Sequence, residues 1–386
     1  MIYGNVQKCF IISDYLVYPN KYMEDIMLDA YMIRNITSAK VLESGYPRNS
    51  IFYNKSRAEE IKVENNLQGK QIMVYMPTWR GIMTKRKNKE QIQEIKMYFD
   101  EIDKKLTDDQ ILYIKLHVFV KSNIDCSEYK HIKEFPNEYE TYDFLNVADI
   151  LITDYSSVFF DYANTGKKII LFPYDKEDYL ATRGIYIDFE KLPFPNVYNA
   201  DELIEEINKV ETVNYKSFID KYCEFDNRDA TKLICKCVFE GKEDGIVNNN
   251  FKKEVKKKNV IIYAGNKSKT KAIEEYLKLF NDLDLQKANY SFLIDCNLLQ
   301  DRVDFVEKIP YSCGIIPYKK DLQFTIFERL KRKLARNKKG TIKKAYERNS
   351  YKCFGKFKFD EAITYSDKKE VVTLLENISK KLIINE

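Results

Sequence analysis

The feature that most constrains this chain is a regular alternation of short apolar runs and amphipathic segments between Gln71 and Pro173. The runs that have the length and composition of buried strands are residues 71–77, 110–117, 131–135, 148–152 and 167–173. Residues 90–106 and 140–147 carry apolar side chains at helical spacing. Strands that alternate with helices form parallel sheets covered on both faces, and such sheets bind ligands beyond the carboxyl ends of their strands. We therefore predict an α/β fold.

Residues 148–163 (ADILITDYSSVFFDYA) combine a strand, a polar turn and the start of a helix. The N-terminus of a helix offers unpaired N–H groups and the positive end of a dipole, which suit a phosphate. Ser156 and Ser157 are placed to cap this helix and to add hydroxyl donors. The residues alone leave open the alternative of an ordinary helix cap without a ligand.

Polar and cationic residues follow the other strands as well. They are Trp79 and Arg80 after the first strand, Lys115 and His117 at the end of the second, residues 153–157 after the fourth, and residues 174–178 after the fifth. Because the carboxyl ends of parallel strands share one edge of the sheet, we expect these residues to line one rim. Cations, hydroxyls and an aromatic ring on one rim suit an anionic nucleotide.

Composition narrows the class of protein. The 386 residues predict two or three domains, and the excess of five basic over acidic residues (64 against 59) does not favour a dedicated nucleic-acid binder. The eight cysteines are scattered and there are two histidines, so we expect reduced thiols, no metal site and no cofactor. No run reaches about 18 apolar residues, and residues 1–22 do not show a basic region followed by an apolar one, so we expect no signal peptide. We expect a cytoplasmic protein, with peripheral membrane attachment as the alternative.

The domain boundaries are predicted from local composition. Residues 1–50, with a strand expected at 10–13 and a helix at 21–32, are too few for a domain of their own. The polar stretch 241–258 predicts a linker, and a second α/β domain is expected at 259–386. Arg48 follows the turn at Gly45 to Pro47 and is either a solvated loop charge or an anion contact.

A basic segment lies at residues 327–344, with seven Lys or Arg between Arg329 and Lys339. It is interpreted as a solvated helix face, or alternatively as a surface attracted to anionic lipid. A nucleic-acid role is not expected, because no aromatic stacking platform accompanies the charges.

Five motifs, in order, resemble the CDP-glycerol glycerophosphotransferase family, whose enzymes prime or polymerise teichoic acids and related polyol-phosphate polymers. The motifs are GYPRN at 45–49, YMPTWRG at 75–81, IKLH at 114–117, ITDYSSVFFDYA at 152–163 and KEDYLATRGIYIDFE at 176–190. Residues 225–239 are similar to the family's closing helix.

The resemblance implies a GT-B fold, in which two Rossmann-like domains face each other and the C-terminal one holds the donor nucleotide. Residues 51–240 map onto that donor domain, and residues 1–50 onto a remnant of the acceptor-side domain. The implied reaction transfers glycerol phosphate from CDP-glycerol to a polyol-phosphate polymer or a lipid-linked acceptor, releases CMP and needs no metal. CDP-ribitol is the alternative donor.

The resemblance also implies roles for individual residues. His117 matches a histidine that contacts the donor pyrophosphate and is the expected catalytic residue. The residues expected to bind the donor are Arg48, Thr78, Trp79, Arg80, Thr153, Asp154, Ser156, Ser157 and Arg183. Asp154 is expected to order its turn, not to act as a base.

The sequence departs from the family in one respect. The family's acceptor-side domain carries a WHGTP-like segment whose histidine is the expected general base, and no histidine precedes His117 here. Residues 259–386 look like the first portion of another GT-B transferase. The chain is therefore interpreted as a piece of a longer transferase or a decayed gene product. Two alternative functions stay open: a nucleotide-binding fragment without turnover, and a sugar-nucleotide glycosyltransferase of the same fold.

Overall fold

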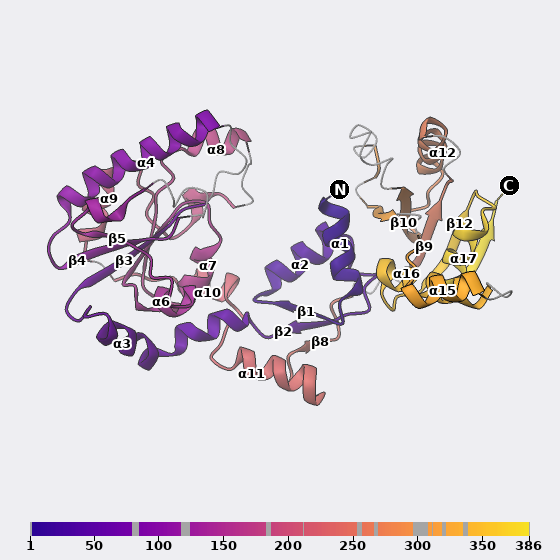
Figure 1. Cartoon of the computed structure of the whole chain (residues 1–386), viewed down its shortest axis with the longest axis horizontal. Helices are drawn as coiled ribbons and strands as arrows, with labels where there is room; N and C mark the ends of the chain where they lie inside the picture. The colour runs from indigo at the N-terminus through magenta and orange to yellow at the C-terminus, as the bar shows by residue number, and fades with distance from the viewer. Residues whose placement is uncertain are drawn as a thin grey trace. The chain divides into compact units, whose positions relative to one another are not determined.

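Two units, each built around its own parallel sheet, make up the described part of the chain (Figure 1). The computed structural model describes residues 2–78, 85–116, 124–182, 187–210, 212–252, 257–265, 269–295, 308–310, 312–318, 322–334 and 339–385. The first unit comprises Met1–Val17, Met23–Leu42 and Gly245–Glu386. The second unit comprises Tyr18–Tyr22 and Glu43–Asp244, so its sequence interrupts that of the first.

The second unit contains a five-stranded sheet in the order β5-β4-β3-β6-β7, in which all neighbours are parallel. The strands are β3 (Gln71–Met76), β4 (Gln110–Ile114), β5 (Ile132–Glu134), β6 (Ile150–Thr153) and β7 (Lys168–Leu171). The order reverses between β3 and β6. A crevice for ligands is expected at such a reversal, outside the carboxyl ends of the strands.

Both faces of this sheet are covered, as the uninterrupted apolar sequence of β3 requires. Ile72 and Val74 point to one core, which also contains side chains from four helices. These are α3 (Lys55–Glu64), α6 (Thr141–Val147), α7 (Val158–Tyr162) and α10 (Lys216–Tyr222). Met73 and Tyr75 point to the other core, beneath α4 (Lys85–Lys105) and α9 (Ala200–Asn208) (Figure 1). Strand alternation thus sends successive residues into different cores.

Shorter elements complete the second unit. They are η1 (Pro47–Tyr53), η2 (Cys126–Glu128), η3 (Ala163–Thr165), α8 (Lys176–Thr182), η4 (Phe189–Lys191), α11 (Ala230–Cys235) and the π-helical turn η5 (Lys236–Glu240). The helix α8 directly follows β7, so it lies at the carboxyl edge of the sheet.

The sheet of the first unit has the order β11-β10-β9-β12-β13 and is also parallel throughout. Its strands are β9 (Lys258–Tyr263), β10 (Ala288–Asp295), β11 (Gly314–Tyr318), β12 (Phe359–Thr364) and β13 (Ser379–Ile384). Its helices are α12 (Lys269–Asn281), α15 (Ile326–Leu334), α16 (Lys339–Phe354) and α17 (Lys369–Ile378). Numbered by their place in the chain, the strands of both sheets have the order 3-2-1-4-5.

The N-terminal segments belong mostly to the first unit, apart from Tyr18–Tyr22 and Glu43. They are α1 (Ile2–Ile12), β1 (Tyr15–Tyr18), α2 (Lys21–Ala30) and β2 (Lys40–Glu43). The helix α1 packs against α16 and β11. The strand β2 pairs with β8 (Val247–Asn248), which lies within the stretch expected to be a linker.

The predicted α/β fold with parallel sheets is confirmed, but one predicted element is wrong. Of residues 10–13, expected to form a strand, the first three lie at the end of α1, and the strand begins at Tyr15. The helix places Gln7 and Ile11 on the same side, one turn apart, and both are buried. Tertiary burial of this face therefore outweighs the β propensity of Phe10, Ile11 and Ile12.

Candidate functional site

The turns after β3 and β6 meet where the strand order reverses. The carboxylate of Asp154 lies between them and is buried, with 1% of the residue exposed. Its Oδ1 accepts a hydrogen bond from the backbone N–H of Thr78 at 2.7 Å and another from that of Tyr155 at 2.6 Å. Hydrogen bonds to a charged acceptor are stronger than neutral ones. Asp154 therefore ties together the two turns that border the expected crevice.

Thr153 is the last residue of β6 and is fully buried. Its hydroxyl donates a hydrogen bond to the carbonyl of Met76, at 2.6 Å, on the neighbouring strand. This side chain therefore joins β6 to the end of β3 at the level where the two turns begin.

The serines after Asp154 differ in what their side chains do. Ser157 occupies the N-cap position of α7, but its side chain makes no capping hydrogen bond and is exposed. The Oγ of Ser156 accepts a hydrogen bond from the N–H of Val158 at 3.4 Å. Of the two expected caps, only Ser156 acts through its side chain. The helix is five residues long, too short for a full helix dipole.

Tyr155 connects this turn to the segment after β7. Its ring stacks on that of Tyr179 in α8, with centroids 3.7 Å apart and planes at 10°. Its hydroxyl donates a hydrogen bond to Oδ1 of Asp175 at 3.2 Å. Residues from the ends of β3, β6 and β7 are thus linked at one edge of the sheet.

Arg48, in η1, is held by Asp161 of α7. Its Nε and Nη2 donate hydrogen bonds to Oδ2 and Oδ1 of that carboxylate, at 3.2 and 3.3 Å. The guanidinium also lies 4.3 Å from the centre of the Tyr46 ring, within range of a cation–π contact. The Asp161 side chain is 6% exposed and that of Arg48 is 48% exposed. The pair therefore presents a fixed cation at the surface, supported by a buried carboxylate.

Two further donors complete the surroundings of Asp161. The amide of Asn49 donates to its Oδ1 at 3.0 Å, and the hydroxyl of Tyr142 donates to its Oδ2 at 2.7 Å. Burial raises the pKa of Tyr142, and the neighbouring carboxylate raises it further, so this hydroxyl stays a donor. Burial lowers the pKa of Arg48, but Asp161 outweighs that effect and the net shift is upward.

A second carboxylate, Asp226, extends this cluster. It accepts hydrogen bonds from the amides of Asn49 and Asn164 at 2.8 and 2.9 Å, and from the N–H of Tyr46 at 2.9 Å. Burial raises the pKa of Asp226, and these hydrogen bonds partly offset the shift. Gly45 has φ of +75°, and a Cβ there would lie 2.6 Å from the Cα of Asp226. Only glycine allows this approach.

Three separate motifs therefore meet in one polar cluster: residues 45–49, the end of 152–163, and the start of 225–239. All three segments are recognisable in the sequence, but Asn49, Tyr142 and Asp226 were not among the predicted site residues. Asn49 and Asp226 stand within motifs that resemble the family, whereas Tyr142 lies outside all of these motifs. Spacing along the chain could not say which of them pair.

Four predicted site residues, Trp79, Arg80, His117 and Arg183, lie outside the described residues. The second histidine of the chain, His131, is described and stands just before β5, at the opposite edge of the sheet from Asp154. Its Nδ1 lies 3.0 Å from the carbonyl of Asp103 and its Nε2 lies 3.1 Å from Oδ1 of Asp108. His131 therefore joins the end of α4 to β5.

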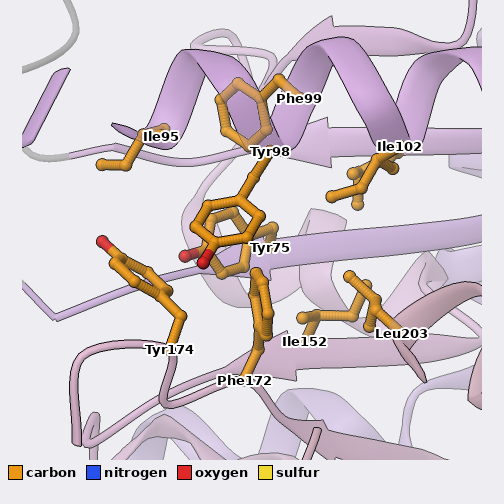
Figure 2. Close-up of a pocket in the computed structure, with 10 residues that line it drawn as sticks. Tyr75, Ile95, Tyr98, Phe99, Ile102, Ile152, Phe172, Tyr174 and Leu203 are labelled. Carbon is orange, nitrogen blue, oxygen red and sulfur yellow. The ribbon is translucent and has the colours of Figure 1, made fainter. Parts of the chain in front are cut away.

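A small apolar pocket lies beneath α4, on the face opposite Asp161. Figure 2 shows the rings of Tyr98 and Tyr174 beside Phe172, with the hydroxyl ends of the tyrosines turned to one side. The space is about 10 Å³, which barely holds one water molecule. This pocket is part of the packed core and is too small for a nucleotide.

The described ranges hold no candidate for a membrane-spanning helix or a metal site. None of the helices there is both long and apolar enough to cross a bilayer. No group of three His, Cys, Asp or Glu side chains is arranged there to hold a metal ion.

Comparison with known proteins gives one consistent result. Residues 5–240 match the model of the family described as CDP-Glycerol:Poly(glycerophosphate) glycerophosphotransferase. A teichoic acid poly(glycerol phosphate) polymerase of Bacillus spizizenii is 35% identical over 234 residues, which cover 57% of this chain and 58% of that protein. A teichoic acid glycerol-phosphate transferase of Staphylococcus aureus is 32% identical over 240 residues, covering 59% of this chain and 60% of that protein.

A solved structure of the wall teichoic acid polymerase TagF also matches, with a TM-score of 0.53 and 27% identity. The match covers 62% of this chain and 60% of that one. The chain thus spans about three fifths of the length of these relatives. The α/β fold of GT-B type that the sequence predicts is confirmed by this likeness and by the two parallel sheets.

Proposed function

Because this chain belongs to the CDP-Glycerol:Poly(glycerophosphate) glycerophosphotransferase family, we propose that it transfers glycerol phosphate from CDP-glycerol to a polyol-phosphate acceptor of the teichoic-acid type. The observation that carries the proposal is the position of Asp154. This buried carboxylate ties the turns after β3 and β6 at the point where the sheet order reverses, inside the region that matches the family. A nucleotide donor is expected to bind at such a point.

In the proposed reaction a terminal hydroxyl oxygen of the acceptor attacks the β-phosphorus of the donor. A new P–O bond forms, the bond from that phosphorus to the bridging oxygen of the pyrophosphate breaks, and the electron pair leaves with CMP. The proton of the attacking hydroxyl passes to water. Negative charge on the transferring and leaving phosphates needs cations and N–H groups around it.

Residues at the carboxyl edge supply these groups in the proposal. The exposed hydroxyl of Ser157 and the N–H groups at the start of α7 would donate to the donor phosphates, beside the turn that Asp154 holds. His117 would donate to the leaving phosphate of CMP, and Arg80 and Arg183 would add positive charge. Trp79 and Thr78 would border the nucleotide from the turn after β3.

Arg48 is proposed to contact a phosphate from the other side of α7. Asp161 engages its Nε and Nη2, which fixes the direction of the guanidinium, and 48% of the side chain is exposed. A cation fixed in this way loses little side-chain entropy when it binds an anion.

We also propose a cellular location for this protein. A polyol-phosphate acceptor can be lipid-linked, so we place the protein at the cytoplasmic face of the membrane, attached peripherally. The sheet of the first unit (β9 to β13) lies outside the matched region, and we propose that it belongs to another glycosyltransferase-like domain.

The test is release of CMP from labelled CDP-glycerol by the full chain, with a soluble polyol-phosphate acceptor. We expect His117→Ala to abolish release. The matched control is His131→Gln, since His131 lies at the opposite edge of the sheet and should leave the activity unchanged.

The same assay separates the alternatives. Release of CMP from CDP-ribitol but not from CDP-glycerol would identify CDP-ribitol as the donor. Release of nucleotide from sugar nucleotides alone would overturn the proposal. A rise in melting temperature with CMP and no turnover with any donor would identify a nucleotide-binding fragment. Full activity of His117→Ala would remove His117 from the mechanism.

A further inference from the structure

The helix α15 (Ile326–Leu334) in the first unit exposes its apolar face to solvent. The exposed fractions are 74% for Ile326, 76% for Phe327, 48% for Leu330 and 85% for Leu334. No residue of this helix is buried. Large apolar side chains scattered singly on a surface are ordinary, but four on one short helix form a patch, and such a patch indicates an interaction site.

The patch occupies one side of the helix because of the spacing of its residues. At 100° per residue, the four apolar side chains fall within an arc of about 100°. Arg329 and Lys333 lie on one flank of the arc, and Lys331 lies on the other. The spacing puts Glu328 and Arg332 on the far side. The helix therefore has an apolar stripe with basic residues along both borders.

The far side anchors the helix to the rest of the unit. Both carboxylate oxygens of Glu328 accept hydrogen bonds from Arg348 of α16 at 2.8 Å. The guanidinium of Arg332 lies 4.2 Å from the centre of the Phe324 ring. These contacts hold the polar side against the protein, so the apolar stripe faces outward.

The start of the helix is fixed locally. The N–H of Glu328 donates to Oγ1 of Thr325 at 3.2 Å, and the N–H of Thr325 donates to Oε2 of Glu328 at 2.8 Å. This reciprocal pair is a capping box. The Arg348 guanidinium and the cap lower the pKa of Glu328 to about 2, so the anchor persists at any physiological pH. The exposed stripe thus belongs to a well-defined helix.

We propose that α15 lies in the headgroup region of an anionic lipid bilayer, with Ile326, Phe327, Leu330 and Leu334 inserted and the flanking basic residues against the lipid phosphates. A short helix with an exposed apolar stripe and basic borders has the features of an interfacial membrane helix. The basic borders complement anionic lipid, and each basic residue at such a surface adds about 1 kcal/mol, or roughly a fivefold gain in affinity. The helix α15 would thus be the element that attaches the protein to the membrane. This role does not depend on the transfer chemistry.

The test is co-sedimentation of the full chain with vesicles of phosphatidylglycerol and, separately, of phosphatidylcholine. We expect tighter binding to the anionic vesicles. The double variant Phe327→Glu with Leu330→Glu should bind them at least about tenfold more weakly, because two large apolar side chains are lost from the stripe and two negative charges face the anionic lipid. Lys331→Ala with Lys333→Ala should weaken binding by roughly twentyfold in low salt and by less in high salt.

The matched control is Phe239→Glu. Phe239 is 82% exposed but lies in η5 of the second unit, so this variant should bind vesicles like the wild type. All the substituted side chains are exposed, so the melting temperatures of the variants should equal that of the wild type. A lowered melting temperature in the double variant, together with unchanged vesicle binding, would contradict the proposal.

Three results would overturn the inference. They are equal binding to both kinds of vesicle, wild-type binding by the double variant, and self-association of the lipid-free wild type that the double variant abolishes. The last would assign the stripe to a contact between copies of the chain. CMP release with a soluble acceptor should be unaffected by the double variant, so failure here and failure of the proposed transfer are distinguishable.

Discussion

The two parallel sheets share one strand order but differ in how the turns at the point of reversal are joined. In the second unit, buried Asp154 bonds to the backbone of the turns after β3 and β6. In the first unit, the corresponding turns follow β9 and β12, and the N–H of Tyr365 donates to the carbonyl of Tyr263 at 3.0 Å. There the hydroxyl of Thr364 accepts from the N–H of Ser366 at 3.1 Å. Topology therefore predicts a crevice in each unit, while the turn residues decide its chemistry.

The largest expected effect tests whether the two units unfold independently. Phe144 in the second unit and Phe292 in the first are both fully buried. Replacing either by alanine should cost about 3–5 kcal/mol, because a cavity remains in a packed core. Each unit has a core of its own, so each substitution should lower the urea midpoint of its own unit only.

The single tryptophan makes this measurable. Trp79 belongs to the sequence of the second unit, so its fluorescence follows that unit, whereas far-UV circular dichroism follows both. Phe144→Ala should shift the fluorescence transition and Phe292→Ala should leave it in place. A shift of equal size with both variants would mean that the two units unfold as one.

The next effect concerns the buried carboxylate of the second unit. Asp161→Ala should destabilise that unit by about 3 kcal/mol, because the donors on Asn49 and Tyr142 lose their shared acceptor. Arg48→Ala removes a half-exposed partner and should cost about 1 kcal/mol. Urea unfolding followed by Trp79 fluorescence compares the two. An equal cost for both variants would show that the ion pair, not the buried network, stabilises the cluster.

A smaller effect distinguishes the two points of reversal. Asp154→Asn weakens a charge-assisted contact to two N–H groups and should lower the free energy of unfolding by about 2 kcal/mol. The variant should also lose the rise in melting temperature that CMP causes. Thr364→Val is the matched change in the first unit and should keep that rise. Loss of the CMP response in Thr364→Val would place nucleotide binding in the first unit and contradict our proposal.

The last effect is a dependence of stability on pH, which is confined to alkaline solution. Lys167 donates to the carbonyls of Asn146 and Ala148 at 2.8 and 2.7 Å, and burial lowers its pKa to about 8. Between pH 8 and its unfolded pKa of about 10.4, the unfolded chain binds a proton that the folded chain has released. Stability should therefore rise with pH across this window, by up to about 1.4 kcal/mol per unit, and stay level below it.

Lys167→Met is the reference for this measurement. It removes the titrating group, so the difference in unfolding free energy between the wild type and the variant should change with pH only above about pH 8. Parallel curves for the two proteins from pH 7 to about pH 10 would contradict the assigned shift.

The sequence predicted the strands of the second unit well, because each is a short apolar run buried on both faces. For example, the strand expected at 148–152 is β6 at Ile150–Thr153. It did not predict the strand order, which depends on pairing between distant segments. The meeting of Thr78 and Asp154 followed from the shared edge of parallel strands. The pairing of Arg48 with Asp161, which are 113 residues apart, could not be read from spacing.

The interruption of the first unit by the second has a consequence for synthesis on the ribosome. The helix α1 packs against β11 and α16, which are translated about 300 residues later. At 5–20 residues per second this delay is roughly 15–60 s. The second unit can finish folding while the apolar side of α1 still waits for its partners. During that interval the apolar side of α1 lacks its packing partners, so a chaperone is expected to bind α1 in the nascent chain.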